Sequence, residues 1–325
     1  MNNRVLAVLL AGVLALTACT TDSGVPVGEG GTPAVPSPEG AAEVTTPPEE
    51  PPAETCDPTA SLRPQGALPA PEALPAGSTM AAIRARGTLI VGINQNTYNF
   101  GYRDPFTGQI AGFEVEMAKR LTLAIFGTAD ALQLRVLTSA QRIPALENKE
   151  VDLVISTMTI NCERREQIEF SSVYYEAIQQ VLVKKGSGYT GLDSLGGEKV
   201  CAADGSTSLD RIAAAPSRPI AVQVPNWTDC LVMLQQNQVE AVSTDDTILA
   251  GFTAQDPFTE IVGEALGAEP YGIGVNKEQT DLVRFVNAVL EQMRADGSWG
   301  QLYGTWVADL LDRQVPPPPA ARYRD

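Results

Sequence analysis

Short apolar runs alternate with amphipathic stretches between residues 80 and 311 of this 325-residue chain. The run Leu89–Ile93 has the length and composition of a buried strand, and residues 114–126 repeat apolar positions at helical spacing. The same alternation predicts strands at 132–137, 151–156, 199–203, 220–224 and 239–243, and helices at 140–148, 208–214, 227–236, 278–295 and 298–311. Strands that alternate with helices predict parallel α/β sheets.

Two stretches of this pattern echo each other. Residues 146–156 and 234–244 both begin with leucine and, after four residues, continue with valine, an acidic residue and a second valine two positions later. We interpret them as the same helix–strand unit in two lobes, so that Thr157 and Asp245 stand at the tips of equivalent strands. Because ligands bind beyond the carboxyl ends of strands in α/β sheets, two facing lobes predict a binding cleft.

Two extended segments, 179–184 and 269–275, flank the second set of elements. We interpret them as paired hinge strands that let the lobes open and close. The predicted domains are a first lobe formed by residues 80–181 with 274–313, a second lobe formed by residues 182–273, and a tail at 314–325.

Composition narrows the function. The formal charge is −16 and no run of Lys or Arg occurs, which argues against a nucleic-acid partner. The chain has no histidine, which removes Ser-His-Asp and Cys-His catalysis and the usual zinc ligand sets. We therefore expect no catalytic residues, no metal and no cofactor.

The N-terminus indicates export. Arg4 precedes an apolar run at 5–16, which is too short for a comfortable transmembrane helix and predicts a signal peptide at residues 1–18. The sequence Leu-Thr-Ala-Cys that ends at Cys19 resembles a bacterial lipobox, which implies that Cys19 is lipidated and becomes the first mature residue. An ordinary signal peptide is the alternative.

The segment after Cys19 is rich in proline and acidic residues. Residues 20–79 contain thirteen prolines and nine acidic residues against one basic residue. Such a composition cannot bury enough apolar surface to fold alone, so residues 19–79 are predicted to be the lipidated cysteine and a disordered stalk. Cys56 interrupts the stalk, and residues 57–62 are candidates for attachment to the folded body.

Four cysteines remain for disulfides in an oxidising exterior. Cys201 and Cys230 fall at a strand end and in the first turn of a nearby helix of the same lobe, which favours their pairing. Cys56 would then pair with Cys162. Four cysteines allow three connectivities, and a redox-active thiol at Cys162 is the competing interpretation.

The segment after the strand at 151–156 concentrates anion-binding groups. Thr157, Thr159 and Arg164 lie within eight residues, and a guanidinium binds two carboxylate oxygens at once. The spacing T-x-T-x-x-x-x-R, followed by Phe170-Ser171, resembles the family-3 extracellular solute-binding proteins that capture polar amino acids, and among them the actinobacterial glutamine/glutamate-binding lipoproteins. The resemblance implies a type II periplasmic-binding-protein-like fold, with two α/β lobes joined by a two-segment hinge.

The resemblance also implies roles at the α-amino-acid end of a ligand. Arg164 would bind the carboxylate with help from the amides of Thr159 and Thr207; a surface helix arginine and a helix cap without ligand are the alternatives. Asp245 would bind the ammonium together with the Thr159 hydroxyl and the Thr157 carbonyl. The alternative for Asp245 is a helix N-cap.

A second segment resembles the side-chain subsite of glutamate/aspartate binders. The match assigns Ser139 and Arg142 to a second carboxylate; a solvated Arg142 on a short helix is the alternative. Asn94 stands where those binders have an arginine and glutamine binders an aspartate, so glutamine and asparagine stay possible although glutamate and aspartate are favoured. The remaining predicted contacts are Met158 and two aromatic residues for which core packing is the alternative, Tyr98 and Phe100.

We predict a lipid-anchored extracytoplasmic protein at the outer face of the cytoplasmic membrane. It closes on a polar L-amino acid and delivers it to the permease of an ABC importer. A sensor domain that signals through a transmembrane protein is the alternative. An enzyme is disfavoured because the chain lacks histidine and the cleft motifs lack an acid/base pair.

Overall fold

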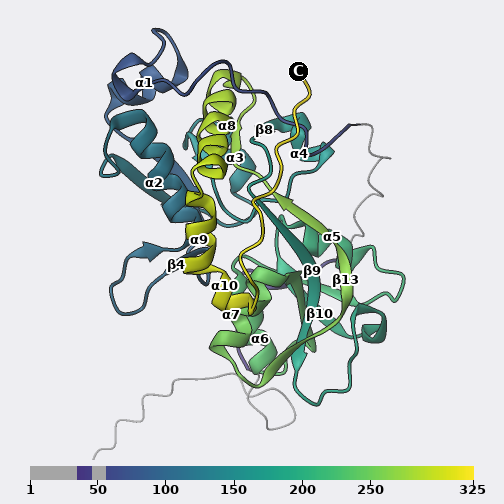
Figure 1. Ribbon diagram of the computed structural model, residues 1–325. Coiled ribbons are helices and arrows are strands. Elements are labelled where there is room, and N and C mark those ends of the chain that lie inside the picture. The colour runs from purple at the N-terminus through teal and green to yellow at the C-terminus, as the bar shows by residue number, and fades with distance from the viewer. Residues whose placement is uncertain (1–34, 46–55) are drawn as a thin grey trace, which may run out of the picture. The chain divides into compact units, whose positions relative to one another are not determined.

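Two sheets organise the described part of the chain (Figure 1). The computed structural model describes residues 35–45 and 56–325, so the predicted signal peptide and Cys19 lie outside the described residues. Residues 37–325 form one compact unit, and we call the parts built on its two sheets the first and second lobes. None of the described helices has the length and hydropathy of a membrane-spanning segment.

The first-lobe sheet has the strand order β6-β2-β7-β14-β8. Its strands are β2 (Leu89–Ile93), β6 (Leu132–Val136), β7 (Leu153–Val154), β8 (Ile168–Phe170) and β14 (Gly274–Asn276), and a small sheet beside it contains β3 (Asn96–Thr97), β4 (Gly101–Arg103) and β5 (Ile110–Ala111). Its helices are α1 (Thr79–Arg86), α2 (Phe113–Phe126), α3 (Arg142–Glu147), α4 (Cys162–Gln167), α8 (Thr280–Ala295), α9 (Ser298–Trp306) and α10 (Ala308–Leu311). β2 pairs in parallel with β6 and β7, as the alternating pattern predicts.

The second-lobe sheet has the order β1-β11-β10-β12-β9-β13. Its strands are β1 (Ala42–Glu43), β9 (Tyr175–Lys184), β10 (Lys199–Ala203), β11 (Ile220–Val224), β12 (Ala241–Asp245) and β13 (Thr259–Tyr271), and its helices are α5 (Thr207–Ala213), α6 (Trp227–Gln235) and α7 (Asp246–Gln255). β10 pairs in parallel with β11 and β12. Short 3-10 helices occur at Pro71–Ala73 and Leu192–Leu195.

A long antiparallel pair, β9 and β13, joins the lobes. The pair runs from Tyr175 opposite Tyr271 to Lys184 opposite Thr259 (Figure 1). Tyr175 and Tyr271 belong to the core of the first lobe, whereas Leu182 belongs to the core of the second. The segments predicted as hinge strands thus fall within this pair and β14; the exact lobe boundaries stay a prediction.

Some predicted elements differ from the observed ones. The strand predicted at 151–156 is shortened to β7, and Thr157, the residue after the predicted strand, adopts a positive φ of 40°. The helix predicted at 298–311 is divided at Val307, whose φ of −117° interrupts the helical turn between α9 and α10.

The described parts of the segment predicted as a stalk at 19–79 are ordered, and residues 57–62 contact the folded body as expected. β1 adds to the edge of the second-lobe sheet by antiparallel pairing with β11. Farther along, the Ser61 side chain is fully buried and donates from Oγ to the Phe170 carbonyl at 2.7 Å. A proline-rich segment that cannot form its own core can still dock on a sheet edge or on backbone groups that need partners.

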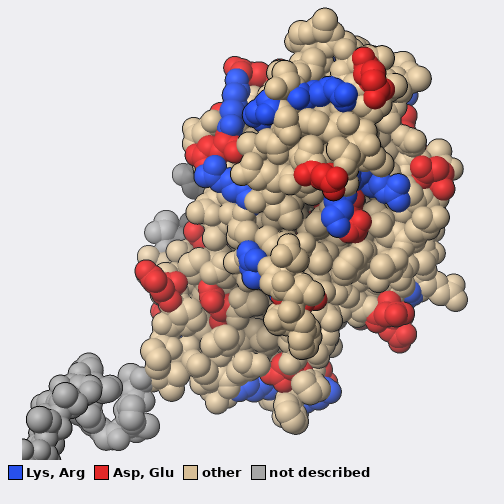
Figure 2. Space-filling view, turned by 90° about the vertical axis from the view of Figure 1, so that its left-hand side faces the viewer, with Lys and Arg blue, Asp and Glu red and all other residues tan. Residues whose placement is uncertain are grey.

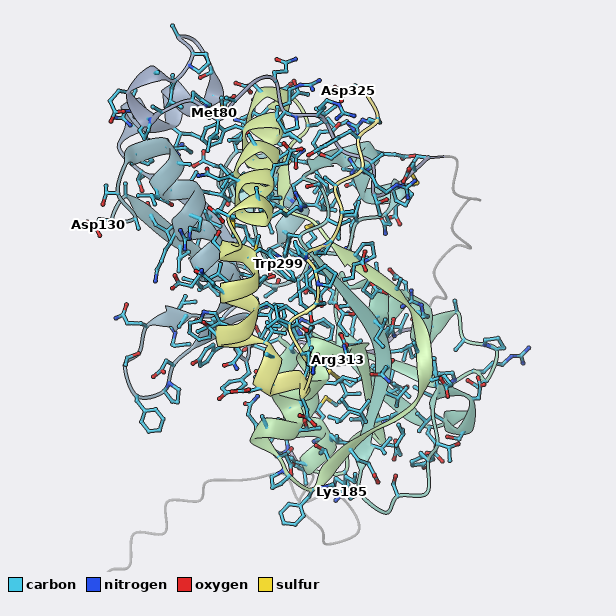
Figure 3. The ribbon with its side chains drawn as sticks, in the orientation of Figure 1. Met80, Asp130, Lys185, Trp299, Arg313 and Asp325 are labelled. Carbon is cyan, nitrogen blue, oxygen red and sulfur yellow. A yellow bond between two sulfur atoms is a disulfide. The ribbon has the colours of Figure 1, made fainter. Side chains whose placement is uncertain are left out.

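The C-terminal tail continues past its proline run and makes hydrogen bonds with the segment around Ser61. Ser61 N–H donates to the Arg322 carbonyl, and Arg324 N–H donates back to the Ser61 carbonyl. The Arg324 guanidinium also binds the buried Glu169 carboxylate at 2.8 Å. Figure 3 labels Arg313 and Asp325 at the two ends of this tail. The segment around Ser61 and the C-terminal tail therefore pack together on the first lobe.

Ion pairs on the surface bring positive and negative side chains together. On the face in Figure 2, Lys and Arg side chains are interspersed with Asp and Glu. Exposed pairs such as Lys149–Glu278 at 2.8 Å are screened by water and contribute little, so packing and disulfides matter more for stability.

Both predicted disulfides are confirmed, Cys56–Cys162 and Cys201–Cys230. The second bond closes a loop with a sequence separation of 29 residues. We expect the double substitution Cys201→Ser/Cys230→Ser to lower the free energy of unfolding by about 3–4 kcal/mol, because the unfolded chain regains loop entropy. Urea denaturation checks this, and an unchanged midpoint would contradict it.

Candidate functional site

Arg164 is a buried guanidinium at the start of α4. The Asn161 side chain caps this helix by accepting from the Arg164 backbone N–H at 2.8 Å. The guanidinium is 8% exposed and donates from Nη1 to the Thr159 carbonyl at 2.7 Å and from Nη2 to the Gly205 carbonyl at 3.2 Å. Burial lowers its pKa. Arg164 is therefore not a surface helix arginine; it contacts both lobes.

The neighbouring Arg165 has a different role from Arg164. It is buried, donates to the Pro58 carbonyl at 2.5 Å and pairs with Glu169 at 3.3 Å. Arg165 thus holds α4 to the N-terminal segment, while Arg164 faces the junction of the lobes.

The segment Thr157–Thr159, called here the threonine segment, is held by the buried side chain of Glu114. This residue was not predicted from the sequence. Its Oε1 accepts from the Thr157 backbone N–H and from the Tyr174 hydroxyl, both at 2.6 Å. Burial raises the pKa of Glu114 to about 7, and its Oε2 has no hydrogen-bond partner among the described residues. Glu114 precedes the apolar residues Ala118 and Leu121 by four and seven positions, and this spacing could have revealed an acid on the buried face of α2.

Met158 and Thr159 pair with the end of β13. The Met158 side chain is fully buried, and its carbonyl accepts from Gly272 N–H at 3.0 Å. Thr159 lies opposite Tyr271 in an isolated bridge. This pairing brings the threonine segment of the first lobe against the hinge strand.

Asp245 ends β12 and precedes α7, yet its side chain does not cap the helix. Its Oδ2 accepts from the Tyr271 hydroxyl at 2.5 Å, whereas its Oδ1 is buried without a hydrogen-bond partner among the described residues. Burial, followed by the nearby charge of Glu269, raises the pKa of Asp245 to about 8. Asp246 has a different role, because it pairs with Arg313 at 2.9 Å.

Arg142 is also buried rather than solvated, with 3% of its surface exposed. It donates from Nε to the Ser139 carbonyl at 3.0 Å and from Nη1 to the Ser156 and Thr157 carbonyls at 3.0 and 3.3 Å. Burial, followed by the like charge of Arg164, lowers the pKa of Arg142 to about 9. Two buried cations this close form a suitable environment for an anion.

Contacts between the lobes converge on Gly205. Its carbonyl accepts from Nη2 of both Arg142 and Arg164 at 3.2 Å. Gly205 has a φ of +72°, and a Cβ at this position would lie 2.7 Å from the Ala140 Cα. Only glycine allows the second-lobe turn to approach the first lobe this closely.

Two predicted site residues, Asn94 and Tyr98, lie in the loop after β2 and differ in what they contact. Asn94 is buried, but its Oδ1 accepts from Asn96 N–H at 2.6 Å, while Asn96 Nδ2 donates to Asn226 of the second lobe at 3.2 Å. Tyr98 also lies at the lobe junction, because its Cβ is 3.0 Å from the position of a Cβ built on Gly251.

Phe100 differs from the expected cleft wall. The ring is fully buried in the first-lobe core and packs edge-on against Tyr175 and Tyr271 at centroid distances of 5.2 and 6.4 Å. An apolar ring is more favourably placed in a hydrophobic core than in a polar cleft.

Glu269 is a second buried acid that the sequence analysis placed in the hinge without a chemical role. Its carboxylate accepts from the hydroxyls of Thr159 and Thr207 at 2.6 and 2.8 Å, and from Arg211 at 2.6 Å. Alternation along β13 puts Glu269 on the same face as Tyr271, which is the signal that could have found it.

The described residues thus place three buried or half-buried arginines and two buried acids around the lobe junction, namely Arg142, Arg164, Arg211, Asp245 and Glu269. No group of three or more potential metal ligands occurs among the described residues. Opposite charges without full internal pairing suit a small ligand that carries both signs.

Comparisons with known proteins agree with this arrangement. Residues 89–309 match the model for bacterial extracellular solute-binding proteins, family 3. The chain is 36% identical over 232 residues to the ABC transporter glutamine-binding protein GlnH of Bacillus subtilis (strain 168), which covers 71% of this chain and 85% of that protein. It is 29% identical over 235 residues to the glutamate-binding protein GluB of Corynebacterium efficiens, covering 69% and 80%.

Solved structures show the same architecture. Holo ArgBP from T. maritima superposes with a TM-score of 0.62 at 31% identity, covering 70% of this chain and 98% of that one. An ancestral arginine-binding protein bound to glutamine gives a TM-score of 0.63 at 34% identity, covering 68% and 98%. The predicted type II periplasmic-binding-protein-like fold is confirmed. With its two α/β lobes, its buried charges and these matches, the chain belongs to the bacterial extracellular solute-binding proteins of family 3, which bind solutes rather than catalyse reactions.

Proposed function

We propose that this protein binds a polar L-amino acid between its lobes, with glutamate and aspartate favoured and glutamine and asparagine also accommodated. The observation that carries the proposal is the Asp245 Oδ1, a buried carboxylate oxygen without a partner among the described residues. Asp245 lies close enough to Arg142 and Arg164 for its charge to oppose the lowering of their pKa values by burial. An α-ammonium on Asp245 and an α-carboxylate on Arg164 satisfy both signs at once.

Each end of the zwitterion has further candidate partners. Thr159 and Thr207 stand close together, with 3.4 Å between their hydroxyl oxygens, and their amides are the proposed second donors to the carboxylate. The Thr159 hydroxyl and the Thr157 carbonyl are the proposed second acceptors for the ammonium. The Thr159 hydroxyl donates to the buried Glu269, and Glu114 holds the Thr157 backbone N–H, so two buried acids fix the position of this segment.

The ligand side chain is proposed to meet Arg142, Ser139 and Asn94, with Met158 and Tyr98 as further predicted neighbours. The buried charge of Arg142 favours a second carboxylate. Relatives of this chain include two named for glutamine, at 36% and 38% identity, and two named for glutamate, both at 29%. These names support five-carbon ligands whose side chain ends in either a carboxylate or a neutral amide.

Arg142→Ala is expected to weaken L-glutamate binding about 10- to 100-fold and L-glutamine binding much less, because a charged hydrogen bond contributes about 1.5–3 kcal/mol. Isothermal titration with both ligands measures the difference. An equal loss for the two ligands would refute a role for Arg142 in binding the side chain.

We further propose that the protein acts outside the cytoplasmic membrane, anchored through a lipidated Cys19, and passes its ligand to an ABC importer. The two disulfides fit an oxidising compartment. The relative from Bacillus subtilis is itself named as part of an ABC transporter, which supports the transport role.

Thermal unfolding in the presence of each of the twenty amino acids tests the proposal. A ligand at one hundred times its Kd stabilises the folded form by about 2.7 kcal/mol, enough for a clear rise in Tm. We expect rises with glutamate, aspartate, glutamine or asparagine, and none with lysine. No rise with any amino acid would refute the proposed function.

A further inference from the structure

Glu269 stands at a central position in the hinge. It lies on β13 opposite Ala177 of β9, and its side chain is fully buried. Tyr271, two residues later on the same face, donates to Asp245. The hinge strand therefore presents an acid to the junction of the lobes, next to the proposed ammonium site.

The Glu269 carboxylate accepts hydrogen bonds from both lobes. Oε2 accepts from Thr159 Oγ1 of the first lobe at 2.6 Å and from Thr207 Oγ1 of the second lobe at 2.8 Å. Oε1 accepts from Arg211 Nη1 of α5 at 2.6 Å. Arg211 also donates to Gln179 on the facing strand β9, so the position of its guanidinium is fixed by the hinge.

This arrangement determines what the Thr159 hydroxyl offers to a ligand. A hydroxyl has one proton to donate, and an ionised carboxylate can only accept. With its proton directed to Glu269, Thr159 Oγ1 presents only lone pairs to any further partner. An ammonium group has only donors, so the hydroxyl is prepared for an ammonium and unsuited to a carboxylate.

We infer that Glu269 is a positioning residue for ammonium recognition, which acts by fixing the Thr159 hydroxyl as an acceptor and by adding its negative charge beside Asp245. The inference rests on the proposed function, because it requires a ligand with an α-ammonium group. It adds a residue of the hinge itself to the recognition of the ligand.

The charge of Glu269 has a measurable consequence for Asp245. After burial, Glu269 is the largest cause that raises the pKa of Asp245, whereas the Arg211 charge lowers it. The other titratable and charged groups that face Asp245 are Tyr271, Asp246, Arg142 and Arg164. Because Asp245 must be ionised to bind an ammonium, affinity is expected to fall as the pH is lowered through the range in which Asp245 titrates.

The test is isothermal titration of the intact protein with L-glutamate and L-glutamine between about pH 6 and pH 9. Glu269→Gln is expected to weaken binding about tenfold at the alkaline end, since its amide oxygen faces the donor Arg211 and its NH2 faces Thr159, whose hydroxyl must then accept instead of donate. Its acid-side midpoint is expected to move to lower pH, since Asp245 loses a neighbouring negative charge. Glu264→Gln, an exposed acid on the same strand, is the matched control and should keep the wild-type profile.

Arg211→Gln provides a second variant at a half-buried position, which keeps the test decisive if Glu269→Gln does not fold. It should move the acid-side midpoint in the opposite direction, to higher pH, because Asp245 loses an attractive charge. Wild-type affinity and an unshifted midpoint in both variants would overturn the inference while leaving the proposed function intact. A wild-type protein that binds no amino acid in the thermal screen would instead overturn the proposed function.

Discussion

Replacing Arg164 with alanine is expected to abolish amino-acid binding and to leave the protein folded. A bidentate guanidinium–carboxylate pair contributes two charged hydrogen bonds of about 1.5–3 kcal/mol each, so the Kd should rise at least about 100-fold. The fold loses two bonds to carbonyls, at Thr159 and Gly205, but also loses a buried charge close to Arg142. These effects on stability oppose each other.

The measurement is isothermal titration, with circular dichroism to confirm folding. Arg135→Ala is the control, because Arg135 is half exposed and pairs only at the surface with Glu150 at 2.5 Å. Arg164→Lys should restore part of the affinity, since it returns the charge without the planar fork. Wild-type affinity in Arg164→Ala would show that the carboxylate binds elsewhere.

Asp245→Asn is expected to weaken binding about 100-fold and to stabilise the unliganded protein at alkaline pH. The affinity falls because the ammonium loses its buried counter-charge. Stability changes in the opposite direction because burial raises the pKa of Asp245 to about 8. A carboxyl with a raised pKa stabilises the fold fully only below its ordinary pKa near 4, and this contribution is lost as the pH rises toward 8.

Urea denaturation at about pH 5 and pH 9 separates these effects. The free energy of unfolding of Asp245→Asn should exceed that of wild type at the higher pH, and the difference should shrink at the lower pH. Asp193→Asn, at an exposed position of the same lobe, is the control and should keep the affinity and stability of wild type at both pH values. A destabilised Asp245→Asn protein at pH 9 would contradict the assigned pKa direction.

Local features of the sequence predicted much of the protein. The spacing of apolar residues identified most helices and strands, and the order of strands and helices indicated two α/β lobes. The positions of Cys201 in a predicted strand and of Cys230 in a nearby helix of the same lobe favoured the disulfide that the structure confirms. The buried Arg142 and Arg164 were selected because their spacing resembles known motifs, although the pattern alone did not distinguish buried from solvated arginines.

The tertiary structure decided which acids surround the site. Thr159 and Glu269 are 110 residues apart, and they meet because the threonine segment pairs with the end of β13. Residues 56–79 and the C-terminal tail pack on the first lobe through backbone bonds as well as side chains, so composition predicted disorder for them except at residues 57–62. Periodicity determines which face of an element is buried, but not which distant element covers it. That choice depends on strand register and lobe packing, and it placed Glu269 at the site.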